Sequence, residues 1–241
     1  MRWLARARMR GYHCTIYEGG GKHMATGTNG NCYLCGATFG KGTIKNHLLK
    51  THDQKGGEHE CILLKIEGAD SKDHWLFIEV PKSDEMQDID YFLRKIWLEC
   101  CGHMSAFCYE PWNEDMEIDM EQKAGSLTVG EKFFHIYDFG STTKTIVTVA
   151  GITRRIKPLK GVRLLARNVP LSYECSKCGK PATHLCHWYD FFCADCSEEF
   201  DEEEEGYLLP VTNSPRMGEC AYFGEKDKFS FDPAAFDKAA R

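Results

Sequence analysis

The chain has 241 residues, of which 42% are hydrophobic and 27% charged, and its formal net charge is −6. This composition excludes collagen-like, low-complexity and coiled-coil proteins, and the length predicts one or two domains with a substantial hydrophobic core. The longest apolar runs are strand-sized, well short of the roughly 18 residues of a membrane span, and no secretory signal pattern opens the chain. We therefore expect a soluble, cytoplasmic protein with no membrane partner.

The cysteine content points to metal rather than to disulfides. Thirteen cysteines are present, and eight of them stand in C-x2-C pairs or in one Cys-Cys doublet. As a fraction of the chain, this cysteine content is below the roughly 8–10% typical of disulfide-stabilised secreted chains. Closely paired cysteines are typical of metal ligation in a reducing compartment. The sequence therefore predicts a metal-dependent intracellular protein.

The charge divides the chain into four blocks of alternating sign. Residues 1–52 carry +7, residues 53–140 carry −12, residues 141–172 carry +7 and residues 173–241 carry −8. A protein that only coats nucleic acid is usually basic overall, and this one is acidic. The two basic blocks would form one local surface if the fold brings them together. The alternative is that residues 141–172 form a solvated strand face.

The first 28 residues are rich in arginine and end beyond a run of three glycines, Gly19 to Gly21. Such a start resembles a mitochondrial transit peptide or a basic arm. It is equally an upstream extension, because Met24 offers a second possible start. We expect residues 1–28 to be a disordered basic extension without a role in the fold.

A zinc finger is predicted for residues 29–56. Its ligands follow the pattern C-x2-C-x11-H-x4-H and are Cys32, Cys35, His47 and His52. Two thiolates on a tight turn and two imidazoles one helical turn apart suit tetrahedral zinc. The segment resembles a two-Cys-two-His finger, although twelve residues rather than eleven usually separate the second cysteine from the first histidine. We expect Phe39, Ile44 and Leu48 to form its small apolar cluster.

The finger offers little for reading bases. The helix positions that usually face bases hold Gly40, Thr43 and Asn46, which are small. Its lysines are suited to phosphate contacts instead, and these are Lys41, Lys45 and Lys50. A finger with a structural or protein-binding role is an equally good interpretation.

The central region, residues 57–170, reads as an α+β domain with a mostly antiparallel sheet and a helix packed on one face. We expect one helix over Asp88–Cys100, because its apolar residues recur at helical spacing, with Ser83 or Asp84 as its cap. A short helix is expected over Ser126–Val129 and a hairpin turn at Phe139–Ser141. The expected strands are Cys61–Glu67, Trp75–Val80, Ser105–Glu110, Met116–Glu121, Lys132–Phe139 and Thr142–Ile152.

Several local strings in and after this region carry a family resemblance. They are Asp90–His103, Tyr137–Thr143, Leu164–Asn168, Leu209–Pro210 and Asn213–Gly218. The chain from about Cys61 to Gly218 resembles the plasmid pRiA Orf-three-like family, and in particular its zinc-finger-bearing members. The resemblance implies an α+β fold and a prokaryotic or mobile-element origin. It implies no established activity.

A cluster at the end of the expected helix has two possible roles. Cys100, Cys101 and His103 are close enough in sequence to share a metal, or to serve as the reactive centre of an enzyme. We favour the alternative in which at least one of the cysteines packs in the core, as free cysteines often do. Asp138 in the Asp-Phe-Gly string is expected to be a turn residue, since no other kinase motif accompanies it.

A second zinc site is predicted in a C-terminal module, residues 171–222, followed by a tail over residues 223–241. The ligands follow C-x2-C-x14-C-x2-C and are Cys175, Cys178, Cys193 and Cys196. Between them lie three further donors suited to an additional metal, His184, Cys186 and His187. The acidic run over residues 201–205 is expected to be a solvated loop.

These observations favour a non-enzymatic zinc-binding protein with two zinc ions and room for a third. Each of the two main sites has four protein ligands, which is typical of closed structural zinc rather than of catalytic zinc. The expected partner is nucleic acid or a nucleic-acid-associated protein, and the sequence identifies no small-molecule substrate. In the second basic block, the candidate phosphate contacts are Arg154, Arg155 and Lys157. The alternatives are a protein-interaction scaffold and an enzyme that uses the Cys100, Cys101 and His103 cluster.

Overall fold

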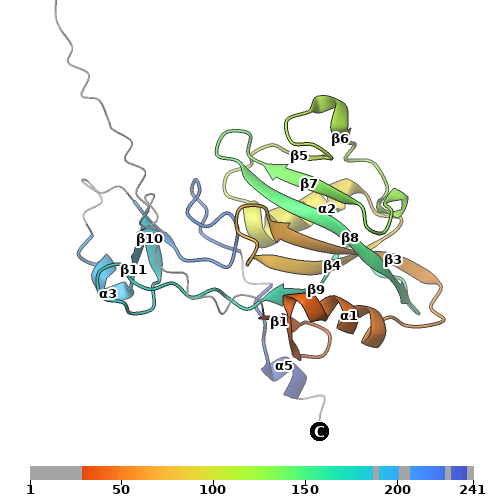
Figure 1. The fold of residues 1–241 in the computed structure, drawn as a ribbon, viewed down its shortest axis with the longest axis horizontal. Coiled ribbons are helices and arrows are strands. Elements are labelled where there is room, and N and C mark those ends of the chain that lie inside the picture. Colours follow the sequence, from red (N-terminus) through yellow and green to blue (C-terminus); the bar gives the residue numbers. More distant parts are fainter. Residues whose placement is uncertain (1–28, 187–189, 201–206, 226–228, 238–241) are drawn as a thin grey trace, which may run out of the picture.

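The computed structural model describes residues 29–186, 190–200, 207–225 and 229–237. Within them the fold is α+β, with a nine-stranded sheet and a separate three-stranded sheet (Figure 1). The expectations for residues 1–28, His187 and the acidic run 201–205 lie outside the described residues. No helix within the described ranges is long and apolar enough to cross a membrane.

The nine strands run in the order β2-β1-β9-β4-β3-β8-β7-β5-β6, and every neighbouring pair is antiparallel. Their bounds are β1 Asn29–Cys32, β2 Thr38–Gly40, β3 His59–Gly68, β4 Trp75–Pro81, β5 Ser105–Cys108, β6 Glu117–Ile118, β7 Lys132–Tyr137, β8 Thr143–Arg155 and β9 Arg163–Asn168. The finger strands β1 and β2 therefore belong to the same sheet as the central region, because β1 pairs with β9.

Both faces of the sheet are covered, which explains the continuous apolar runs in β3 and β4. Ile62, Leu64 and Ile66 of β3 pack in the main core with α2, Met86–Leu93. Leu63 between them points to the opposite face and packs in a second core with α1, Lys41–Thr51. The alternation of a β-strand thus sends successive side chains into two different cores.

The expected helix over Asp88–Cys100 is present, but its limits and its cap differ. It starts at Met86 and continues beyond Leu93 as a π-helical turn, η1, over Arg94–Leu98. Its cap is Glu85 rather than Ser83 or Asp84, because the Glu85 N–H donates to Asp88 Oδ2 at 2.9 Å. Asp88, three residues after the cap, completes the reciprocal pattern of a capping box.

Most of the remaining elements expected for the central region are present, but their limits differ: β5, β6 and β7 are shorter than expected, and β3, β4 and β8 extend further. The turn at Phe139–Ser141 joins β7 to β8 as a hairpin. The expected strand over Met116–Glu121 contains only β6, preceded by the 3₁₀ turn η2, Glu114–Met116. The short helix expected over Ser126–Val129 is a 3₁₀ turn, η3, two residues earlier at Ala124–Ser126.

The C-terminal module has its own small sheet in the order β11-β10-β12. Its core consists of Leu185, Phe191 and Leu209, with Tyr173 stacked on Phe191 at a ring distance of 4.4 Å. The elements of this part are β10 His184–Cys186, β11 Phe191–Phe192, α3 Ala194–Ser197, β12 Leu208–Pro210 and α5 Ala234–Asp237. So small a core requires a further source of stability, such as a bound metal.

Candidate metal centres

Within the described residues, three groups of cysteine and histidine side chains could each hold a metal ion, and in each group the ligand atoms lie within 4.8 Å of one another. Two are the groups expected from the spacing, and the third adds Cys220 to the Cys100, Cys101 and His103 cluster. Such groupings of thiols and imidazoles suggest metal binding by the described part of the chain.

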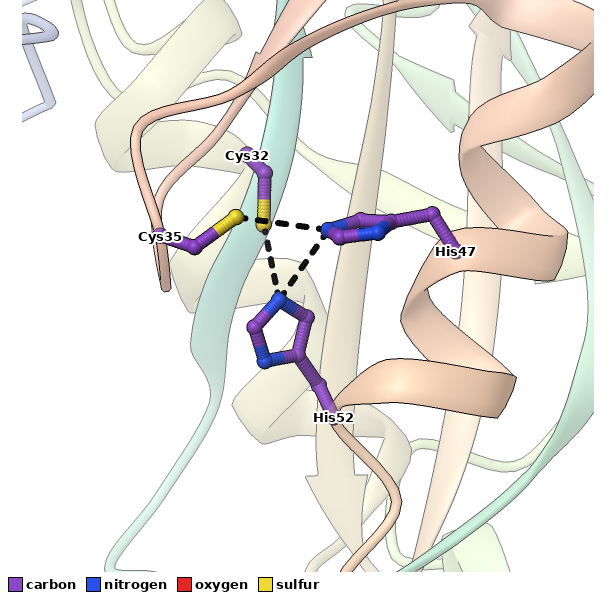
Figure 2. A group of neighbouring side chains, drawn as sticks. All are labelled: Cys32, Cys35, His47 and His52. Carbon is purple, nitrogen blue, oxygen red and sulfur yellow. Dashed lines mark hydrogen bonds between the residues drawn. The ribbon is translucent and has the colours of Figure 1, made fainter.

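The first group forms where β1 ends against α1 (Figure 2). Cys32 is the last residue of β1, and the turn after it closes through a hydrogen bond from Gly36 N to Cys32 O at 2.8 Å. Gly36 has a φ of +77°, a conformation that other residues rarely adopt. This turn directs Cys35 back toward the strand, so both thiols of the pair face the helix.

The histidines of the first group come from the C-terminal end of α1, where His47 lies in the helix and His52 is the residue directly after it. Cys32 Sγ lies 3.5 Å from His52 Nε2, Cys35 Sγ lies 3.3 Å from His47 Nε2, and the two Nε2 atoms are 3.1 Å apart. With metal–sulfur bonds of about 2.3 Å and metal–nitrogen bonds of about 2.0 Å, a tetrahedral site places sulfur and nitrogen about 3.5 Å apart. The spacing of eleven residues is therefore compatible with a closed tetrahedron.

The expected apolar cluster of the finger is present, but it is part of the large sheet. Ile44 and Leu48 are fully buried against Trp75 and Leu165, and Phe39 packs at the edge of the same core. The Phe39 ring also stacks on His47 at 4.0 Å. The helix is thus positioned by the central sheet as well as by its ligands.

In the first group, the histidines are ready to bind a metal, whereas Cys32 must first lose a proton. Burial lowers the pKa of His47 and of His52, so both imidazoles are neutral and able to ligate near pH 7. Burial raises the pKa of the Cys32 thiol to about 11. A metal must therefore displace the Cys32 proton, and binding at this site should weaken as the pH falls.

The second group lies in the C-terminal module, where two cysteine turns face each other. Cys178 Sγ lies 3.6 Å from Cys193 Sγ and 3.7 Å from Cys196 Sγ, close to the roughly 3.8 Å edge of a four-thiolate tetrahedron. Gly179 follows the first pair with a φ of +73°, and its N–H donates to Cys175 O at 2.9 Å. The hairpin of β10 and β11 spans the interval between the pairs.

Burial by itself would raise the pKa of Cys175, but hydrogen bonds from the backbone N–H groups of Cys193, Cys178 and Lys177 outweigh it and lower that pKa to about 6. One thiolate of this group therefore forms near neutral pH. A cation that arrives at the module finds a negative sulfur already in place.

The further donors proposed between these cysteines do not join a group within the described residues. His184 and Cys186 lie on β10, and neither belongs to a metal-binding group there. The His184 ring nitrogen Nδ1 pairs with Thr183 Oγ1 at 2.9 Å, and Cys186 is buried.

The third group combines the turn after η1 with a residue far along the chain. Cys101 Sγ lies 3.6 Å from Cys220 Sγ and 2.9 Å from His103 Nε2, and Cys100 Sγ lies 3.8 Å from Cys101 Sγ. Cys100 also packs against the main core, as expected for at least one of the cysteines. Cys220 has no sequence signal, because it is an isolated cysteine distant from the others.

The basic residues singled out from the sequence fall into two groups of three. Lys41 pairs with Glu67, Arg154 pairs with Asp53 and Arg155 is buried beside Glu79. Lys45, Lys50 and Lys157 are exposed.

Arg155 has a structural role next to the first metal group. Its Nε donates to Glu79 Oε2 at 2.9 Å, and its Nη1 donates to the backbone carbonyl of His52. Glu79 is fully buried and also pairs with Arg163. The guanidinium therefore connects a ligand of the first group to a buried carboxylate of the sheet.

Comparison with known proteins adds little to this geometry. No protein-family model and no curated protein matches the chain. One solved structure that is similar in part is a protein of unknown function, MM3350, from Methanosarcina mazei Go1. It shares 15% sequence identity over 47% of this chain and 70% of its own, with a TM-score of 0.37, and supports no inference about fold or function.

Proposed function

We propose that the protein is a non-enzymatic zinc-binding protein that binds nucleic acid weakly, through phosphate contacts and without base discrimination. Sulfur and imidazole nitrogen at tetrahedral distances are the donor set that zinc prefers. Four protein ligands in each of the first two groups leave no open position for a substrate, which supports a structural rather than a catalytic metal.

The observation that carries the proposal is the meeting of the two basic blocks. Helix α1 of the first block packs on β8 and β9 of the second, and β1 pairs with β9. The loop after α1 is hydrogen-bonded to the end of β8, from Gln54 N to Arg154 O at 3.0 Å and from Ile156 N to Gln54 Oε1 at 2.7 Å. The exposed lysines of α1 and of the segment after β8 therefore belong to neighbouring parts of the fold.

We call this region the basic surface and define it by Lys45, Lys50, Lys55 and Lys157, all of which are exposed. No acidic residue occurs between Lys41 and His52, so the outward face of α1 carries only positive charge. Asp53, the next residue after His52, forms an ion pair with Arg154. With few free cations, binding should be modest in affinity.

The test is fluorescence anisotropy with random DNA and RNA at low and physiological salt. Replacing Lys45, Lys50 and Lys157 with alanine should weaken binding and flatten the salt dependence on duplex DNA, by about 0.9 in log–log slope for each phosphate that these lysines neutralise in the wild type. Wild-type affinity should be the same for unrelated sequences, because Thr43 and Asn46 offer little to base edges.

The matched control replaces three exposed lysines elsewhere, Lys95, Lys132 and Lys177, so that the net charge changes equally. This control variant should keep most of the wild-type affinity for nucleic acid and the wild-type slope of its salt dependence. If wild-type protein binds no nucleic acid even at low salt, the proposal is wrong and the acidic net charge favours a protein-interaction scaffold instead.

We also propose membership of the plasmid pRiA Orf-three-like family and a cytoplasmic location. In support of the first, the strings that carry the resemblance pack on one another, since Trp97 Nε1 donates to Asn213 O and Asn168 Nδ2 donates to Asn213 Oδ1. In support of the second, the cysteines of the described residues are free thiols, as expected in a reducing compartment.

A further inference from the structure

We propose that Cys100, Cys101, His103 and Cys220 bind a third zinc ion, which links the segment after the C-terminal module to the end of η1. This inference is independent of nucleic-acid binding. It concerns a group in which three ligands are close in sequence and the fourth is separated from His103 by 117 positions.

The distances fit a tetrahedral site with three sulfurs and one nitrogen. Two sulfurs bound to one zinc lie about 3.8 Å apart, and a sulfur and a nitrogen lie about 3.5 Å apart. Cys100 and Cys101 are 3.8 Å apart, Cys101 and Cys220 are 3.6 Å apart, and Cys220 Sγ lies 3.5 Å from His103 Nε2. The distance from Cys101 Sγ to His103 Nε2 is shorter, 2.9 Å, and an ion between these atoms would lengthen it.

One backbone feature of the group is shared with the other two, although its first two cysteines are adjacent in sequence. Gly102 follows the second cysteine with a φ of +83°, in the same position and conformation as Gly36 and Gly179. Its N–H donates to Glu99 Oε1 at 2.6 Å, which fixes the turn. Each of the three groups therefore has a left-handed glycine directly after its second thiol.

Charged and aromatic side chains surround the group. Arg216 Nη2 lies 3.5 Å from Cys100 Sγ, and Arg216 is fully buried with Asp138 as its carboxylate partner. When the three cysteines bind zinc as thiolates, the net charge of the site is negative, and this guanidinium partly balances it. The His103 ring packs edge-on against Tyr137 at 5.8 Å, which holds the imidazole in place. Asp138 Oδ2 lies 3.3 Å from the same Nε2 atom that would bind the zinc, so the metal would replace this contact.

Cys220 itself is held in an unfavourable conformation. Its φ is +51°, in the left-handed region that residues with a Cβ rarely adopt. The preceding residues are already anchored on η1, because Ser214 Oγ donates to Trp97 O at 2.6 Å and Trp97 Nε1 donates to Asn213 O at 3.1 Å. A bound zinc would hold Cys220 in this conformation and extend that anchoring beyond Gly218.

The test uses full-length protein loaded with ¹¹³Cd in place of zinc. The cadmium chemical shift moves downfield with each added thiolate, so the three groups predict three separate resonances, for two, three and four sulfur ligands. Metal analysis of the zinc form should give three equivalents per chain. A wild-type spectrum that holds only the two-sulfur and four-sulfur resonances would overturn the proposal, and this result does not depend on any variant folding.

Two variants locate the third site. Cys101→Ser combined with Cys220→Ser should remove the intermediate resonance and one zinc equivalent, and should raise the rate of tryptic cleavage after Arg216 by about tenfold or more. Cys108→Ala removes a buried thiol outside the three groups and should retain all three resonances. An intermediate resonance that persists in the double variant would contradict this choice of ligands.

Discussion

At the scale of single residues, the molecule places charged groups inside the core and provides each with a partner. His135 is fully buried and its Nε2 lies 2.7 Å from Asp90 Oδ1, while Ser105 Oγ and Arg94 Nε also donate to that carboxylate. Burial by itself would raise the pKa of Asp90, but these hydrogen bonds outweigh it and hold that pKa at about 2. Asp90 therefore stays ionised over the whole working range of pH.

The neutral state of His135 predicts a pH dependence of stability. Burial lowers its pKa in the folded protein, whereas the unfolded imidazole takes up a proton below about pH 6.5. The contribution of neutral His135 to the free energy of unfolding is thus complete above about pH 6.5. As the pH falls further, this contribution declines by at most about 1.4 kcal/mol per pH unit. His135→Gln, which keeps an N–H donor for Asp90, should reduce the slope of the urea midpoint against pH.

The control for this measurement is His59→Gln, at the exposed start of β3, which should leave the slope unchanged. All three proteins contain the same metal groups, so acid release of metal cancels in the comparison. Identical slopes for wild type and His135→Gln would mean that His135 titrates equally in the folded and unfolded states.

At the scale of elements, the finger is joined to the sheet where β1 pairs with β9. This contact requires glycine at position 30, because a Cβ there would lie 2.3 Å from Trp75 Cη2 and 2.4 Å from Arg167 O. The Trp75 ring, which belongs to the second core, occupies the space that a side chain would need. The first metal group is therefore positioned by packing as well as by its ligand spacing.

A matched pair of glycine substitutions tests this. Gly30→Ala should destabilise the zinc-loaded protein by about 1–3 kcal/mol, the usual cost of overpacking, because β1 must move away from β9. Gly42→Ala, on the open face of α1 with nothing within 4 Å of the new Cβ, should stabilise it by about 0.5 kcal/mol through helix propensity. Urea unfolding compares the two, and equal stability of Gly30→Ala and wild type would contradict the packing argument.

At the scale of the whole molecule, the finger and the C-terminal module differ in how much of their stability comes from bound metal and how much from hydrophobic packing. The finger helix buries Ile44 and Leu48 in a core shared with β3, β4 and β9. Among its described residues, the C-terminal module has only Leu185, Phe191 and Leu209 at the centre of its own core. Removal of metal should therefore affect the module more than the finger, and the main sheet least.

Hydrogen exchange after treatment with a strong chelator measures this order. Amides of β10 and β11 should lose protection first, those of α1 in part, and those of β3, β4 and β8 should stay protected. Cys175→Ser should reproduce the loss in the module without chelator, and protease cleavage should then concentrate between residues 171 and 200. Simultaneous loss of protection in all elements would show instead that the metals and the sheet form one cooperative unit.

The sequence by itself determined the parts in which the physics is local. The ligands Cys32, Cys35, His47 and His52 lie within one short segment, so a knuckle and one helix bring them together, and the same holds for the module around Cys175 and Cys196. The helix near Asp88–Cys100 and the hairpin at Phe139–Ser141 were predicted by apolar periodicity and turn chemistry.

Only the tertiary structure decided what depends on distant pairing. The sequence of β1 has no pattern that selects β9 as its partner. Arg155 on β8 forms an ion pair with Glu79 on β4 because both strands pair with β3, which brings the two side chains together. Cys220 joins Cys101 and His103 because the segment from Asn213 is hydrogen-bonded to η1. Contacts over such separations leave no spacing rule in the sequence, since chain folding rather than local geometry sets the distance between the residues.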